Sequence, residues 1–179
     1  MLSPKLVKVA VCGDGPLTLR RLGWLRDCGA DPFVYAPAPS DDLALLAGPR
    51  IINRFPAKAD FDGLGAIWIA DLAPEVATSL ADSARAAGTL TNVEDVIEQC
   101  DFHTPSVVHR GRLTLAIGTG GASPAIASIV RQRLEAAFPS DWSQLIEDVA
   151  TDRLERKALG ATFSELVEAA KTKIAEAGL

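Results

Sequence analysis

Residues 6–29 read LVKVAVCGDGPLTLRRLGWLRDCG, and this stretch decides the fold. Leu6 to Cys12 is an apolar run rich in β-branched residues, as expected of a buried strand. The turn Gly13-Asp14-Gly15 ends that run, and Leu17 to Cys28 then has helical spacing that Gly29 closes. A strand, a glycine turn and a helix in this order predict a Rossmann-type, dinucleotide-binding α/β domain that reaches to about residue 120.

Strands and helices continue to alternate after this unit. Strands are expected at 32–35, 50–53, 66–70 and 90–93, and helices at 40–47 and 74–87. Helical crossovers of this kind join parallel strands and place helices on both faces of a sheet. The extended runs 106–109 and 112–117, joined by Arg110-Gly111, predict a small antiparallel addition to the sheet. Ser123-Pro124 predicts the start of a helix, and a C-terminal helical extension follows from Pro139 onward.

Composition and charge restrict the possible classes of protein. The 179 residues are 48% hydrophobic and 23% charged, which is ordinary for a folded soluble domain, and the net charge of -5 disfavours binding to nucleic acid. Met1 to Lys8 has no apolar leader, and glycines interrupt the uncharged run 113–130, so we expect a cytoplasmic protein without a membrane span. Three cysteines without CxxC spacing predict buried free thiols rather than disulfides or a zinc site.

The glycine turn is the predicted cofactor site, because a strand, a glycine loop and a helix N-terminus together bind a pyrophosphate. The residues expected to bind NAD are Gly13, Asp14, Gly15, Pro16 and Leu17. Pro16 lacks an N–H donor, Asp14 brings a negative charge, and Thr18 stands where a third small residue is usual. No acid ends the second strand, where the chain reads Tyr35-Ala36-Pro37, so the usual ribose ligand is missing and weak cofactor affinity is expected. A turn that serves the structure alone is the alternative.

A later segment carries a more specific resemblance. It runs Asn92-Val93-Glu94-Asp95, Cys100-Asp101-Phe102, Pro105-Ser106-Val107-Val108, Arg110-Gly111 and Thr119-Gly120-Gly121-Ala122-Ser123-Pro124. Following a glycine loop, this pattern resembles the siroheme synthase N-terminal module, which comprises precorrin-2 dehydrogenase and sirohydrochlorin ferrochelatase. The likeness spans residues 6 to about 138. It implies NAD-dependent oxidation of precorrin-2 to sirohydrochlorin, insertion of ferrous iron as a substrate to give siroheme, and a homodimer with interlocked C-terminal helices.

The resemblance also assigns residues to roles. The aspartate that the family uses in both reactions falls on Asp95, which would act as a general base. An ordinary helix cap is the alternative for Asp95. Substrate binding is implied for Asn92, Arg110, Thr119, Gly120 and Gly121. Arg20, Arg21, Arg110 and Arg112 are suited to the carboxylate arms of a tetrapyrrole, or else are solvated surface arginines. His103 and His109 do not form a metal-ligand set by their spacing, and no metal site is expected.

The expected organisation has three segments: an NAD-binding domain over 1–105, a strand-loop-helix segment for dimerisation and the active site over 106–138, and a helical extension over 139–179. Apolar residues form one stripe on the last helix: Phe163, Leu166, Val167, Ala170 and Ile174. This stripe needs a partner surface, either in its own globule or in a second copy. The altered glycine loop leaves two alternatives to the full activity, a chelatase for iron or cobalt that has lost dehydrogenation, and a non-catalytic tetrapyrrole- or nucleotide-binding homologue.

Overall fold

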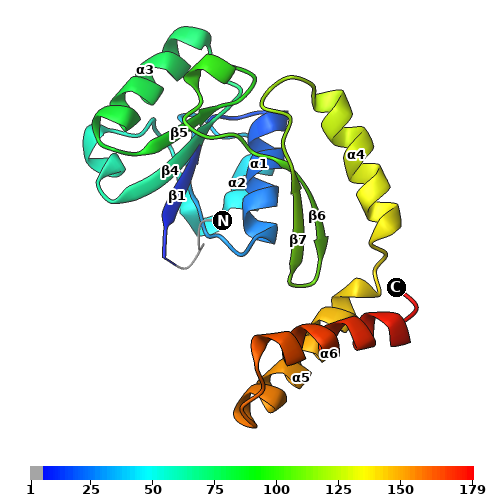
Figure 1. Ribbon diagram of the computed structural model, residues 1–179. Coiled ribbons are helices and arrows are strands. Elements are labelled where there is room, and N and C mark those ends of the chain that lie inside the picture. The colour runs from blue at the N-terminus through cyan, green and yellow to red at the C-terminus, as the bar shows by residue number, and fades with distance from the viewer. Residues whose placement is uncertain (1–5) are drawn as a thin grey trace. The chain divides into compact units, whose positions relative to one another are not determined.

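The computed structural model describes residues 6–179, which form two compact units that divide between His103 and Thr104. The first unit contains a five-stranded parallel sheet in the order β3-β2-β1-β4-β5 (Figure 1). Its strands are β1 Lys8–Cys12, β2 Phe33–Tyr35, β3 Ile51–Ile52, β4 Leu64–Ile69 and β5 Leu90–Val93. The chain runs outward from β1 to β3 and then resumes beside β1 as β4. The strand order therefore reverses between β1 and β4, and ligands bind at such a switch point in open α/β sheets.

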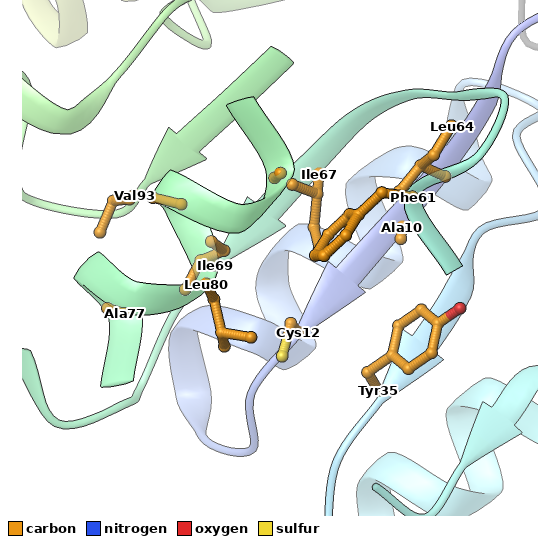
Figure 2. Packing of buried hydrophobic residues seen from close by; sticks show 12 residues of the cluster. Ala10, Cys12, Tyr35, Phe61, Leu64, Ile67, Ile69, Ala77, Leu80 and Val93 are labelled. Atoms are coloured by element: carbon orange, nitrogen blue, oxygen red, sulfur yellow. The ribbon is translucent and has the colours of Figure 1, made fainter. Parts of the chain in front are cut away.

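Helices cover both faces of this sheet, as predicted. They are α1 Pro16–Asp27, α2 Asp41–Ala47 and α3 Pro74–Ala86, with short 3-10 turns η1 Gly48–Arg50, η2 Lys58–Phe61 and η3 Ile97–Gln99. Successive side chains of β1 point to opposite faces. Ala10 and Cys12 pack in one cluster with α3 and Phe61 (Figure 2), whereas Val9 and Val11 pack in another cluster with Leu25 of α1.

The second unit is a hairpin followed by three helices. Its elements are β6 Ser106–Arg110, β7 Leu113–Ile117, α4 Pro124–Ala137, α5 Trp142–Ala158 and α6 Phe163–Glu176. The predicted antiparallel pair is present, but it forms a two-stranded sheet of its own rather than extending the five-stranded sheet. Ser123 caps α4 by accepting from the Ile126 N–H at 3.2 Å, and Thr162 and Glu165 form a capping box at α6. Within residues 6–179, no helix combines the length and apolar character that a membrane crossing requires.

Candidate functional site

The glycine turn packs closely against the end of β4. Gly13 has a φ of 137°, and a Cβ added there would lie 1.8 Å from the carbonyl oxygen of Ala70. A Cβ added at Gly15 would lie 2.5 Å from Cγ of Asp71. Gly13 therefore requires glycine because of the backbone beside it, and glycine at position 15 leaves the space that the Asp71 side chain occupies, before any ligand is considered.

Asp71 is the second residue after β4, and its side chain contacts the first turn of α1. Its Oδ2 accepts hydrogen bonds from the Thr18 N–H at 2.7 Å and from the Thr18 hydroxyl at 2.8 Å. A carboxylate is favourable there because the N-terminus of a helix carries partial positive charge. Asp71 has a φ of 54°, a conformation that aspartate adopts more readily than most residues. The sequence reasoning missed this contact, and its one available signal was an acidic residue following a buried strand.

Asp14 turns toward the segment that follows β2. Its Oδ2 accepts from the Ser40 N–H at 2.8 Å and its Oδ1 accepts from the Ser40 hydroxyl at 2.7 Å. Ser40 is also the N-cap of α2, where the sequence predicts a helix over 40–47. One half-buried carboxylate thus links the loops after β1 and β2 at the same edge of the sheet.

Whether a dinucleotide fits depends on which backbone N–H groups at the start of α1 are not already hydrogen-bonded within the chain. The Thr18 N–H is held by Asp71, the Leu19 N–H bonds the Gly15 carbonyl at 3.0 Å, and Pro16 has no N–H. The N–H groups of Gly15 and Leu17 have no hydrogen-bond partner in the part of the chain that the structure describes. The residues therefore fit a dinucleotide whose diphosphate is held by these two N–H groups, a smaller set of donors than an unmodified turn offers.

Asp95 lies in the turn after β5, at the same edge of the sheet as the glycine turn. It is exposed, its φ is 64°, and its carboxylate has no hydrogen-bond partner among residues 6–179. The helix-cap alternative is wrong, because Val96 is the residue that precedes η3 and no side chain caps this turn. The carboxylate of Asp95 is free to act on a ligand.

The neighbouring residue, Glu94, connects this turn to α1. Its carboxylate accepts from Arg20 at 2.9 Å and from Arg21 at 2.8 Å, and its N–H bonds the Ile69 carbonyl at 2.9 Å. The side chains of Arg21 and Glu94 are only 11% and 10% exposed. Arg21 is thus buried in its pair with Glu94, whereas Arg20 pairs with the same carboxylate and is 65% exposed, as a surface arginine is. Both arginines hold the turn that carries Asp95.

Asn92 is 6% exposed and is occupied by the loop that follows β5. Its side-chain amide donates to the Phe102 carbonyl at 2.9 Å and to Cys100 Sγ at 3.4 Å. Asp101 is held in the same loop by the Thr91 N–H at 2.8 Å. Burial acts to raise the pKa of Asp101, but the hydrogen bonds from Thr91 and Arg85 lower it overall. Asn92 supports the edge of the site, and its predicted contact with substrate stays a prediction.

The other predicted substrate residues belong to the second unit. Arg110 donates to the backbone carbonyls of Phe138 at 2.6 Å and Glu135 at 3.2 Å, so its guanidinium holds the C-terminal end of α4. The Thr119 hydroxyl accepts from the Ser123 N–H at 3.3 Å across the turn that contains Gly120 and Gly121. Both glycines have positive φ, which the turn requires.

The histidines and cysteines add no ligand set. His103 and His109 are exposed, and the His109 Nδ1 lies 3.1 Å from the Thr114 hydroxyl. Within residues 6–179, no group of three or more His, Cys, Asp or Glu side chains is placed to hold a metal ion. Burial raises the pKa of the Cys12 thiol to about 12, as expected of a core cysteine. The prediction of a buried thiol is wrong for Cys28, which is exposed.

A parallel sheet with a glycine turn at its switch point defines a dinucleotide-binding fold, and comparisons with known proteins identify its family. Residues 1–106 match the family described as "Putative NAD(P)-binding", and residues 110–137 match the family described as "Sirohaem biosynthesis protein central". The chain belongs to this NAD(P)-binding family, in the form of the siroheme synthase N-terminal module, so the family predicted from the sequence is confirmed.

Individual relatives agree with this assignment. The siroheme synthase of Pseudomonas entomophila is 32% identical over 155 residues, covering 85% of this chain and 34% of that protein. The siroheme synthase of Methylococcus capsulatus is 34% identical over 149 residues, covering 82% of this chain and 31% of that protein. The chain thus spans about a third of the length of these relatives. The solved structure of SirC, precorrin-2 dehydrogenase, has the same fold, with a TM-score of 0.75 at 23% identity over 97% of this chain and 87% of that chain.

Proposed function

We propose that this protein oxidises precorrin-2 to sirohydrochlorin with NAD, and that it inserts ferrous iron, as a substrate, to give siroheme. The observation that carries the proposal is the carboxylate of Asp95 at the carboxyl edge of β5, which is exposed and has no hydrogen-bond partner among residues 6–179. Only β4 separates β5 from β1, whose end carries the glycine turn. The names of the siroheme synthase relatives and of the SirC structure supply the substrate class.

In this proposal one carboxylate accepts protons in both reactions, the oxidation of precorrin-2 and the insertion of iron. NAD, when bound, supplies the acceptor for the hydride that the oxidation releases. Asp95 takes up the proton that leaves the macrocycle in the same oxidation. When iron enters, two pyrrole N–H protons must leave, and the exposed Asp95 accepts them one at a time, releasing the first to water before it takes the second. Glu94, held by Arg20 and Arg21, fixes the turn from which Asp95 projects.

The activity is tested by following absorbance in two assays with the full chain. The first assay supplies precorrin-2 with NAD, and the second supplies sirohydrochlorin with ferrous or cobalt ion. Formation of sirohydrochlorin in the first assay and of the metallated product in the second is expected. A protein that binds tetrapyrrole but turns over neither substrate would overturn the proposal.

The role of Asp95 is tested by Asp95→Asn, which removes the base and keeps the size of the side chain. Loss of a general base lowers the rate by about a hundredfold or more, so that fall is expected in whichever assay proceeds. Glu98→Gln is the matched control, since Glu98 is an exposed acid three residues along the same loop. An Asp95→Asn variant with full activity contradicts the assignment.

A second candidate is a chelatase that has lost dehydrogenation. It is favoured by one observation, the reduced set of donors at the start of α1, where Asp71 holds the Thr18 N–H and Pro16 offers none. Metal insertion without oxidation of precorrin-2 is the outcome that would select it. The cytoplasmic location and the boundaries at 105 and 138 stay predictions.

A homodimer is part of the proposal. Neither α4 nor α6 contains a buried residue. Large apolar side chains are exposed along the three helices of the second unit: Ile126, Ile129, Leu154, Leu159 and Phe163. A second copy that packs on these side chains would bury them. Two copies are proposed because most homo-oligomers are symmetric dimers.

A further inference from the structure

The middle position of the glycine turn holds a carboxylate that is directed away from the start of α1. Both oxygens of Asp14 accept hydrogen bonds from Ser40, one from its N–H at 2.8 Å and one from its hydroxyl at 2.7 Å. Ser40 lies five residues beyond the end of β2. The carboxylate of Asp14 therefore stands at the carboxyl end of β2, although it comes from the loop after β1.

In a dinucleotide-binding sheet, the residues after β2 face the ribose of the adenosine. An acid there accepts from the ribose 2′-hydroxyl, and an arginine accommodates a 2′-phosphate. The chain has no acid from Tyr35 through Ser40. We propose that Asp14 supplies the missing ribose acceptor and makes this protein selective for NAD over NADP. This inference rests on the dinucleotide binding contained in the proposed function.

The hydrogen-bonding capacity of Asp14 suits this role. An ionised carboxylate has about four acceptor positions, and Ser40 uses two of them. The remaining positions accept from ribose hydroxyls, which donate. A 2′-phosphate has no such donor to offer at neutral pH, and it meets the negative charge of Asp14. The N–H and hydroxyl of Ser40, which a phosphate would need, are already bonded to Asp14.

The basic side chains around β2 and β3 do not offset this charge. Arg54 pairs with Asp60. Arg50 pairs with Asp31, and Arg26 bonds the carbonyls of Leu46 and Ala47. Among residues 6–179, no arginine or lysine forms an ion pair with Asp14.

The test is titration calorimetry of the full chain with NAD and, separately, with NADP. NAD is expected to bind at least about tenfold more tightly, as one charged hydrogen bond is gained and one repulsion avoided. Asp14→Asn removes the charge with little change of shape, and it should bring the two affinities to within about threefold of each other. Asp14→Ser serves as a second variant, with circular dichroism to verify that each variant is folded. Asp42→Asn is the matched control and should keep the wild-type ratio.

The outcomes separate this inference from the proposed function. Equal affinity of the wild-type protein for NAD and NADP overturns the inference and leaves dinucleotide binding intact. An unchanged ratio in both Asp14 variants, or an equal loss of selectivity in Asp42→Asn, also overturns it. Failure of the wild-type protein to bind either dinucleotide contradicts the NAD-dependent part of the proposed function itself.

Discussion

Residues 6–103 and residues 104–179 differ in how completely they bury their apolar side chains. The first unit holds nearly all of the buried apolar residues, whereas the second contributes only Val108 and Leu145 to them. A parallel sheet between two helical layers completes its own core, but three helices and a hairpin of this length do not. The comparison indicates that the first unit is stable by itself and that the second needs another apolar surface.

The largest effect is expected in the core of the first unit. Ile67 is fully buried in the cluster shown in Figure 2, and Ile67→Ala should lower the free energy of unfolding by about 2–5 kcal/mol. Denaturation in urea measures this change. Ile97→Ala is the control, because Ile97 is 52% exposed and its loss should change stability by less than about 0.5 kcal/mol. Similar costs for both variants would contradict the difference in burial.

A smaller effect is expected where the second unit would meet its partner. Ile129 of α4 is 52% exposed, and Ile129→Asp should raise the dissociation constant of the dimer about a hundredfold, as truncation of a central interface residue does. Sedimentation velocity over a range of concentrations measures it. Ile97→Asp is the control, because Ile97 lies in the first unit and is also 52% exposed. A wild-type protein that stays monomeric at every concentration would refute the dimer.

The smallest effect is expected from acid acting on an ion pair of the first unit. The hydrogen-bonded Arg54 guanidinium lowers the pKa of Asp60 to about 2, and the Ala57 N–H contributes in the same direction. A lowered pKa stabilises the folded state above the unfolded pKa of about 4, and this contribution is lost as the pH falls from about 4 to 2. The gain is small because half of the Arg54 side chain is exposed.

Asp60→Asn should therefore have a lower melting temperature than wild type at pH 6, and most of this difference should be lost at pH 2. Thermal denaturation followed by circular dichroism at both pH values makes the measurement. Asp82→Asn, which changes a largely exposed acid of α3, is the control and should behave as wild type at both pH values. A gap between Asp60→Asn and wild type that persists at pH 2 would show that Asp60 acts through packing rather than charge.

The fold could be predicted from the sequence because the patterns that define it are local. Alternating apolar residues, the glycine turn and the helix start at Ser123-Pro124 each lie within a few positions of the element they define. The separate sheet of β6 and β7 was not readable, since hydrophobic alternation predicts a strand without naming the strand it pairs with.

The candidate site was readable only in part. Asp71 meets Thr18 across 53 positions of the chain, and Glu94 meets Arg21 across 73, and no local pattern predicts such pairs. Asn92 is the opposite case. Its place in a family motif predicted contact with substrate, whereas in the structure its side-chain amide donates to the Phe102 carbonyl. Asp95 lies just after a strand, as predicted. This position depends only on the topology of the sheet.

The close packing of Gly13 on Ala70 and of Gly15 on Asp71 has an evolutionary consequence. A descendant that no longer bound any nucleotide would still be unable to replace Gly13 without moving the end of β4, or Gly15 without displacing the side chain of Asp71. Selection for foldability would preserve the fingerprint long after selection for the cofactor had ceased. The presence of the two glycines therefore reports on the packing of the sheet, and the residues between and after them are the ones that a change of ligand would alter.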